Sequence, residues 1–184
     1  GVLGGMGPES TAIFYHAVIK QCQKQYGAQY DEDYPEIFIY NLPIPNIVEG
    51  LNKPDETLDM LIKGTKKIES IGVDFIVMPC NTAHYFLAEV QKKVNIPIID
   101  MTKVLVKKVL EEQPPIRKIG ILATTGSLKT EIYQRYFKLI GVQTILPSEE
   151  DQKNLEALKN KAFALRMLGN CDEAIQNYKR IIGI

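Results

Sequence analysis

Residues 73–82 read Val-Asp-Phe-Ile-Val-Met-Pro-Cys-Asn-Thr, an apolar run that ends at a proline and continues directly into a cysteine. The run is apolar enough to form a buried strand, and Pro79 stops it because proline cannot donate to a strand ladder. A residue just past the C-terminal end of a parallel strand lies in the crevice where open α/β sheets bind ligands. Cys80 therefore stands where a reactive side chain is expected, and a small cysteine that only packs in the core is the alternative.

A helix is predicted directly after this loop, and it bears on the chemistry of the cysteine. Asn81 or Thr82 is the predicted N-cap, and residues 82–94 have a helical pattern. The positive end of a helix dipole favours negative charge, so the thiol of Cys80 is expected to ionise more readily than a free cysteine. His84 follows Cys80 by four residues and either orients the site or satisfies a helix terminus.

Short apolar runs alternate with runs of helix length throughout the first 148 residues. The strand-like runs occupy residues 1–3, 36–40, 73–78, 96–100, 118–123 and 142–146. The helix-like runs begin at Ser10 or Thr11 and recur at 54–71, 82–94, around 104–109 and at 129–140. This alternation is typical of βαβ units and predicts an α/β fold, with an open, mostly parallel sheet and flanking helices.

The last part of the chain has a different character. Residues 149–184 hold charged and amphipathic runs without a strand, which predict a C-terminal helical hairpin. We therefore divide the chain into an α/β domain at 1–148 and a helical tail at 149–184. The tail weakly resembles a single tetratricopeptide-like repeat. One helix pair cannot bury its own apolar face, so the tail is expected to dock on the α/β domain or on another chain.

Composition excludes several classes of function. Basic and acidic residues balance at 22 each, which gives no basic surface for nucleic acid or for an anionic membrane. No run approaches the length of a membrane span. Three widely spaced cysteines and two histidines fit neither a disulfide framework nor a metal centre, so we expect no metal and a reducing, cytoplasmic location.

Three predicted strand ends, after Leu3, Met78 and Ala123, are followed by glycine, asparagine, threonine or serine. Because the carboxyl ends of parallel strands meet at one edge of a sheet, these loops are expected to form one site. The glycines of residues 4–7 let the backbone approach a ligand closely, but their spacing is not that of the dinucleotide-binding motif.

With Gly4-Gly5-Met6-Gly7-Pro8, Pro79-Cys80-Asn81-Thr82 and the Leu-Ala-Thr-Thr-Gly of residues 122–126 in place, the chain resembles the aspartate/glutamate racemase family over about residues 1–153. The resemblance implies an isomerase with two pseudo-symmetric α/β halves that needs no cofactor. Each half of such an enzyme supplies one cysteine, and the two face opposite sides of the substrate α-carbon. One thiolate removes the α-proton, and the other thiol returns a proton from the far side.

Carried over to this sequence, the resemblance makes Cys80 a catalytic acid/base and aspartate or glutamate the substrate. A homodimer is also expected. The residues that would bind the substrate are Met6, Gly7, Asn41, Asn81, Thr82, Thr124, Thr125 and Ser127.

Two departures from the family pattern leave alternatives open. Many aspartate-type members carry an arginine after the Pro-containing loop, where this chain has Asn46 and Ile47. The second half, with its Gly-Cys-Thr motif, is absent from these 184 residues, and neither Cys22 nor Cys171 follows a strand. One alternative is an inactive binding module for a small dicarboxylate or amino acid, with the tail docking a partner. Another is one-base chemistry on Cys80.

Overall fold

The structure is a computed structural model that describes residues 1–47, 50–112 and 115–148. The predicted helical hairpin at 149–184 and Cys171 lie outside the described residues, and the domain boundary after residue 148 stays a prediction. The chain forms two compact units, one of residues 1–117 and 123–142, the other of residues 118–122 and 143–184.

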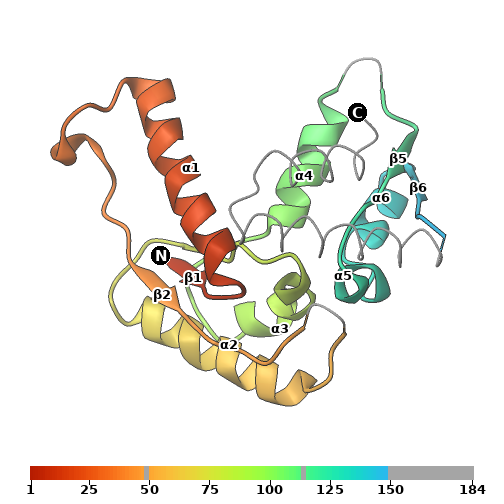
Figure 1. The fold of residues 1–184 in the computed structure, drawn as a ribbon, viewed down its shortest axis with the longest axis horizontal. Helices are drawn as coiled ribbons and strands as arrows, with labels where there is room; N and C mark the ends of the chain where they lie inside the picture. Colours follow the sequence, from red (N-terminus) through yellow and green to blue (C-terminus); the bar gives the residue numbers. More distant parts are fainter. Residues whose placement is uncertain (48–49, 113–114, 149–184) are drawn as a thin grey trace, which may run out of the picture. The chain divides into compact units, whose positions relative to one another are not determined.

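The first unit is built on a four-stranded parallel sheet (Figure 1). Its strands are β1 (Val2–Gly4), β2 (Ile39–Asn41), β3 (Ile76–Val77) and β4 (Ile98–Ile99), in the order β2-β1-β3-β4. Val2 is paired with Ile39 on one side and with Val77 on the other. The predicted α/β fold with a mostly parallel sheet is confirmed, although each strand is shorter than its apolar run.

Helices and two short turns connect the strands. They are α1 (Pro8–Tyr26), α2 (Pro54–Glu69), α3 (Leu87–Gln91), α4 (Met101–Leu110), α5 (Thr125–Lys129) and α6 (Gln134–Leu139), with 3-10 turns η1 (Asp31–Asp33) and η2 (Thr82–Phe86). Two of the helices in the structure differ from the predicted ones. The one expected at 82–94 begins as the tight turn η2. Of the one expected at 129–140, α6 covers the middle part, and α5 precedes it and ends at Lys129.

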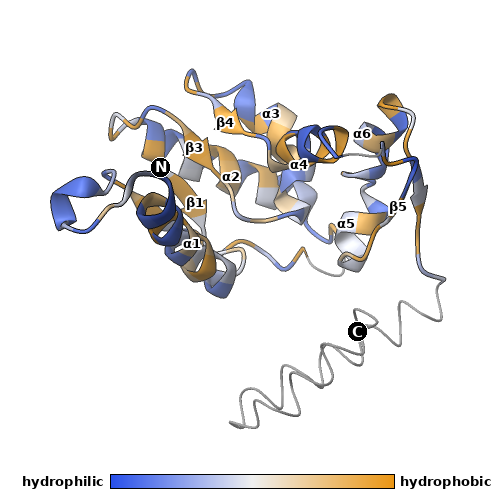
Figure 2. Ribbon diagram, turned by 90° about the horizontal axis from the view of Figure 1, so that it is seen from above, coloured by the Kyte–Doolittle hydropathy of each residue, from blue (hydrophilic) through white to orange (hydrophobic). Residues whose placement is uncertain are grey.

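The core lies between the sheet and helices α2 and α3. Strands β1, β3 and β4 are coloured as hydrophobic in Figure 2, and the fully buried side chains include Leu3, Leu61, Ile68, Ile76 and Val90. Gly64 lets α2 approach closely, because a Cβ at this position would lie 3.1 Å from Leu3 Cδ1.

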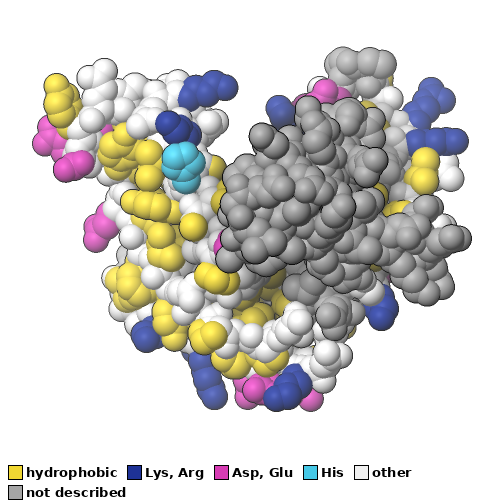
Figure 3. Space-filling model, in the orientation of Figure 1, with side chains coloured by type: hydrophobic (Ala, Val, Ile, Leu, Met, Phe, Trp, Pro, Cys, Tyr) yellow, Lys and Arg dark blue, Asp and Glu magenta, His cyan; other side chains and the backbone are white. Residues whose placement is uncertain are grey.

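Helix α1 is covered much less. Thr11 and Cys22 are its buried residues, whereas the apolar Ile13 is 65% exposed. Hydrophobic side chains are visible on this part of the surface in Figure 3.

In the second unit, β5 (Lys118–Gly120) pairs in parallel with β6 (Gln143–Ile145). Among the described residues these strands form a separate two-stranded sheet, so the expectation of a single sheet is wrong. The hydrophobic pattern identified both strands but carries no information about which strand pairs with which.

Candidate functional site

Three loops meet at one edge of the four-stranded sheet. Strands β2, β1 and β3 are parallel neighbours, so the residues that follow them leave the sheet at the same edge. These residues include the predicted Met6 and Cys80, both half-buried, and Gly7 and Asn41, both exposed. The parallel topology thus brings the glycine loop and the cysteine loop to one edge.

The glycine loop lies directly against the end of β2. Gly5 has a φ of +91°, and a Cβ there would lie 2.6 Å from Leu42 N and 3.0 Å from Asn41 Oδ1. The buried Thr11 holds the loop from the other side. Its hydroxyl accepts from the Gly5 N–H (3.0 Å) and donates to the Gly7 carbonyl (3.3 Å). The predicted helix start at Ser10 or Thr11 is wrong, because α1 already begins at Pro8, and Thr11 fixes the loop instead.

The cysteine loop turns into η2 through two backbone hydrogen bonds. Cys80 N–H donates to the Met78 carbonyl (2.8 Å), and His84 N–H donates to the Asn81 carbonyl (3.0 Å). Asn81 makes no side-chain cap, contrary to the prediction. Its Oδ1 accepts a hydrogen bond from the Tyr133 hydroxyl instead.

Burial sets the ionisation of Cys80. Desolvation raises the pKa of its thiol, and the backbone N–H groups of Ala83 and Thr82, which face the sulfur, lower it by less. The predicted ease of ionisation is therefore wrong for this structure. A single 3-10 turn offers the sulfur only a few N–H dipoles, and these do not compensate for removal from water.

Three hydroxyl groups form a cluster beside the cysteine loop. Thr82 Oγ1 lies 3.0 Å from Ser127 Oγ and 3.3 Å from Thr124 Oγ1, and the Thr124 hydroxyl donates to Ser127 Oγ (3.0 Å). Thr82 and Ser127 are buried. Thr125, also predicted for the site, is half-buried at the start of α5. The structure thus brings Thr82 to Thr124 and Ser127, which lie 42 and 45 residues further along the chain.

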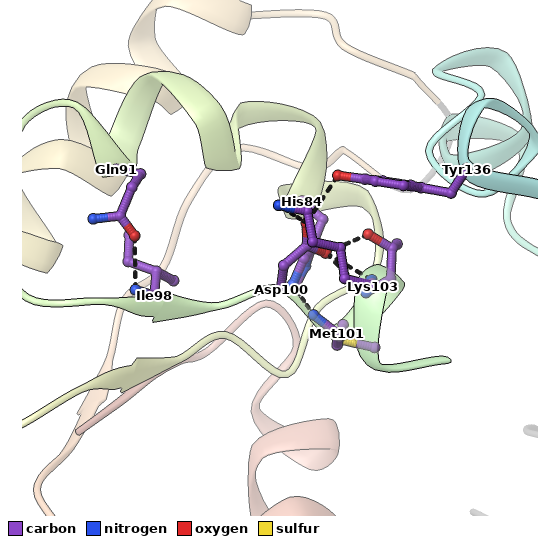
Figure 4. Close-up of polar contacts among 8 residues, drawn as sticks. His84, Gln91, Ile98, Asp100, Met101, Lys103 and Tyr136 are labelled. Carbon is purple, nitrogen blue, oxygen red and sulfur yellow. Dashed lines mark hydrogen bonds and ion pairs between the residues drawn. The ribbon is translucent and has the colours of Figure 1, made fainter. Parts of the chain in front are cut away.

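A second polar group is centred on Asp100, directly before α4 (Figure 4). Asp100 caps α4, because its Oδ1 accepts from the N–H groups of Thr102 (3.0 Å) and Lys103 (3.2 Å). Its Oδ2 accepts from the Tyr136 hydroxyl (2.9 Å). The Thr102 hydroxyl also donates to Asp100 Oδ1. Burial alone would raise the pKa of Asp100, but the hydrogen bonds from the Thr102 hydroxyl, the Lys103 N–H and the Tyr136 hydroxyl outweigh it, and the net pKa is lowered.

Sequence reasoning missed Asp100, Tyr133 and Tyr136. An aspartate before a helical run is an N-cap signal, and it would have identified Asp100. The two tyrosines gave no signal, because only the tertiary fold brings them to Asn81 and Asp100. Asp100 and Tyr136 also line a cavity of about 390 Å³, together with His84.

The described residues contain no group of His, Cys, Asp and Glu side chains suited to a metal ion. Within the same residues, no helix has the length and apolarity needed to cross a membrane. The site edge therefore offers a half-buried thiol, N–H groups that face it, and neutral hydroxyl and amide groups. Such a set can transfer a proton beside a bound carboxylate.

Comparisons with known proteins agree on one class of protein, the racemases. Residues 3–182 match the family described as Asp/Glu/Hydantoin racemase. This match runs through the tail, for which the tetratricopeptide-like interpretation finds no support. The broad specificity amino-acid racemase RacX of Bacillus subtilis is 39% identical over 145 residues, which are 79% of this chain and 63% of that protein.

Two solved structures of similar fold each cover 100% of this chain at 25% identity. They are the aspartate racemase of Picrophilus torridus (TM-score 0.73, 74% of that chain) and an aspartate racemase homologue from Pyrococcus horikoshii (TM-score 0.71, 80% of that chain).

Proposed function

The chain belongs to the Asp/Glu/Hydantoin racemase family, and from this we propose that Cys80 exchanges the α-proton of an amino acid without a cofactor. In the proposed reaction the Cys80 sulfur takes the proton from the α-carbon of one enantiomer, or gives a proton to it in the reverse direction. The electron pair left on the α-carbon delocalises into the carboxylate, where N–H and O–H donors stabilise the added charge. The chain spans 63% of the length of RacX, so the activity of the whole protein is part of this proposal.

One observation carries the proposal: a half-buried thiol at the carboxyl end of β3, with the N–H groups of Thr82 and Ala83 directed at the sulfur. The hydroxyl cluster of Thr82, Thr124 and Ser127 lies next to the cysteine loop, and we propose that its hydroxyl groups exchange their mutual hydrogen bonds for ones to a substrate carboxylate. We propose the remaining contacts from the other site residues, namely Met6, Gly7, Asn41, Asn81 and Thr125.

Aspartate and glutamate are the first substrates to test. Asn46 and Ile47 stand where many aspartate-type members have an arginine, and RacX is named for broad specificity. Both observations favour a test panel that also includes amino acids with uncharged side chains.

The test is proton NMR of each amino acid incubated with the protein in D₂O. Loss of the α-proton signal with formation of the other enantiomer supports racemisation. Cys80→Ser should abolish exchange, and Cys22→Ser, which changes a buried cysteine of α1, should retain it. Full exchange by Cys80→Ser would refute the role of Cys80.

A binding module is the second candidate. It is favoured by one observation: within the described residues, Cys80 is the one cysteine at the site edge, and Cys22 lies in α1. Binding of aspartate that raises the melting temperature without exchange would support this candidate. Exchange without inversion would indicate one-base chemistry. A homodimer also stays a proposal.

A further inference from the structure

We infer that His84 is a positioning residue, whose imidazole fixes the carbonyl of Cys80 and thereby the orientation of the thiol. Figure 4 shows His84 beside the start of α4, near Met101. His84 is buried at 7% exposure, and both of its ring nitrogens are within hydrogen-bond distance of backbone groups. The inference rests on the proposed function, because it assigns His84 to the same site.

The hydrogen bonds determine the tautomer of His84. The Met101 N–H can only donate, so His84 Nε2 accepts from it (3.2 Å). The proton of the neutral ring is then on Nδ1, which donates to the Cys80 carbonyl (2.7 Å). The ring therefore bridges two backbone groups, because it accepts a hydrogen bond from the Met101 N–H and donates one to the Cys80 carbonyl.

Local backbone geometry explains why this bridge is needed. In an α-helix the His84 N–H would donate to the Cys80 carbonyl, four residues back. In η2 it donates to Asn81 instead, and the side chain of His84 takes the Cys80 carbonyl. At the other end, Asp100 caps the N–H groups of Thr102 and Lys103, and His84 accepts the N–H of Met101.

Two substitutions separate the two ends of the bridge. In His84→Asn, the shorter amide can place an N–H where Nδ1 lies and keep the contact to Cys80, but it cannot reach Met101. In His84→Gln, the longer side chain can place an oxygen where Nε2 lies and keep the contact to Met101, but it loses the one to Cys80. The exposed His16 on α1 provides the control, His16→Asn.

The measurements are the melting temperature and the rate of α-proton exchange. We expect both His84 variants to melt lower, but only His84→Gln to lose about tenfold or more in exchange rate, because small displacements of reacting groups have large effects on rate. Equal losses of rate in both variants, or unchanged rates in both, would overturn the inference. If His84→Gln does not fold, His84→Asn decides: a retained rate supports the inference and a lost rate overturns it.

Alkylation of Cys80 separates this inference from the proposed function. If the wild-type protein shows no exchange with any amino acid of the panel, the proposed function fails, but the pH midpoint of Cys80 alkylation by iodoacetamide still tests His84. Loss of the Cys80 contact should misalign the N–H groups of Thr82 and Ala83 and raise the midpoint in His84→Gln only. Tyr133 and Asp100, which also act on this part of the site, are unchanged in every variant. Equal midpoints in both variants would overturn the inference.

Discussion

Replacing Asp100 by alanine should destabilise the first unit, because this carboxylate connects α4 to α6. Its side chain is 10% exposed. Loss of the N-cap to Thr102 and Lys103 costs about 1 kcal/mol. Loss of the Tyr136 hydrogen bond to a charged, largely buried acceptor costs about 2 kcal/mol. The ion pair with the exposed Lys103, at 3.9 Å, adds little.

The expected decrease in the free energy of unfolding is therefore about 3 kcal/mol. For a chain of this length it corresponds to a melting temperature lower by about 6–12 °C. Urea unfolding followed by circular dichroism measures the change. Tyr136→Phe, alone and combined with Asp100→Ala, completes a double-mutant cycle whose coupling energy should be about 1–2 kcal/mol. Asp59→Ala, at an exposed position of α2, is the control and should stay within about 0.5 kcal/mol of wild type.

The same contacts predict a dependence on pH. The pKa of Asp100 is lowered in the folded protein, so its contribution to stability is complete above its unfolded pKa of about 3.9 and is lost as the pH falls through the folded value. The difference in stability between wild type and Asp100→Asn should therefore shrink in that acidic range. A change of less than about 0.5 kcal/mol for Asp100→Ala at neutral pH, with no coupling to Tyr136, would refute the reasoning.

Three further predictions concern the site edge. Iodoacetamide should alkylate Cys80 with a pH midpoint above that of a free cysteine, because burial raises the pKa of the thiol. Mass spectrometry of the labelled peptide measures this midpoint, and a midpoint below that of a free cysteine would contradict the burial argument. Gly5→Ala should lower the free energy of unfolding by about 1–3 kcal/mol, because Gly5 has a positive φ and lies close to Leu42. Gly7→Ala should have little effect, because there is open space around the added methyl group. Urea unfolding measures both variants, and equal effects would be inconsistent with this explanation. Tyr133→Phe removes the donor to Asn81 Oδ1 and should raise KM for an amino-acid substrate by about fivefold. The NMR exchange assay measures KM, and an unchanged KM would argue against a role of Asn81 in binding.

Much of the fold could be predicted from the sequence because hydrophobic periodicity is a local property. The apolar run before Pro79 and the helix-like run at 54–71 each correspond to an observed element, β3 and α2. Strand pairing is not local, so the separate sheet of β5 and β6 was missed. The tight turn η2 was also missed, because residues 82–94 match an α-helix equally well.

In the candidate site, too, some features could be predicted from the sequence and others depend on the tertiary fold. Parallel topology predicted that the glycine loop and Cys80 share an edge, and the structure places them there. The contact of Tyr133 with Asn81 joins residues 52 positions apart, and no spacing rule in the sequence indicates it. The predicted direction of the Cys80 pKa shift was wrong for a related reason. A helix terminus can be read from sequence, but the degree of burial that outweighs it depends on the whole unit.

The raised pKa of Cys80 has a consequence for the proposed reaction. A thiol that holds its proton at neutral pH can give it to an α-carbon, but it removes a proton only if the bound substrate stabilises the thiolate. The α-ammonium group of an amino acid placed near the sulfur would do so, because an opposite charge in a poorly solvated site favours the ionised form. A carboxylate near the sulfur would have the opposite effect. In the proposed reaction, efficient proton removal by Cys80 therefore requires the ammonium group to lie closer to the sulfur than the carboxylate does. This orientation is compatible with the proposed binding of the carboxylate at the hydroxyl cluster beside the cysteine loop.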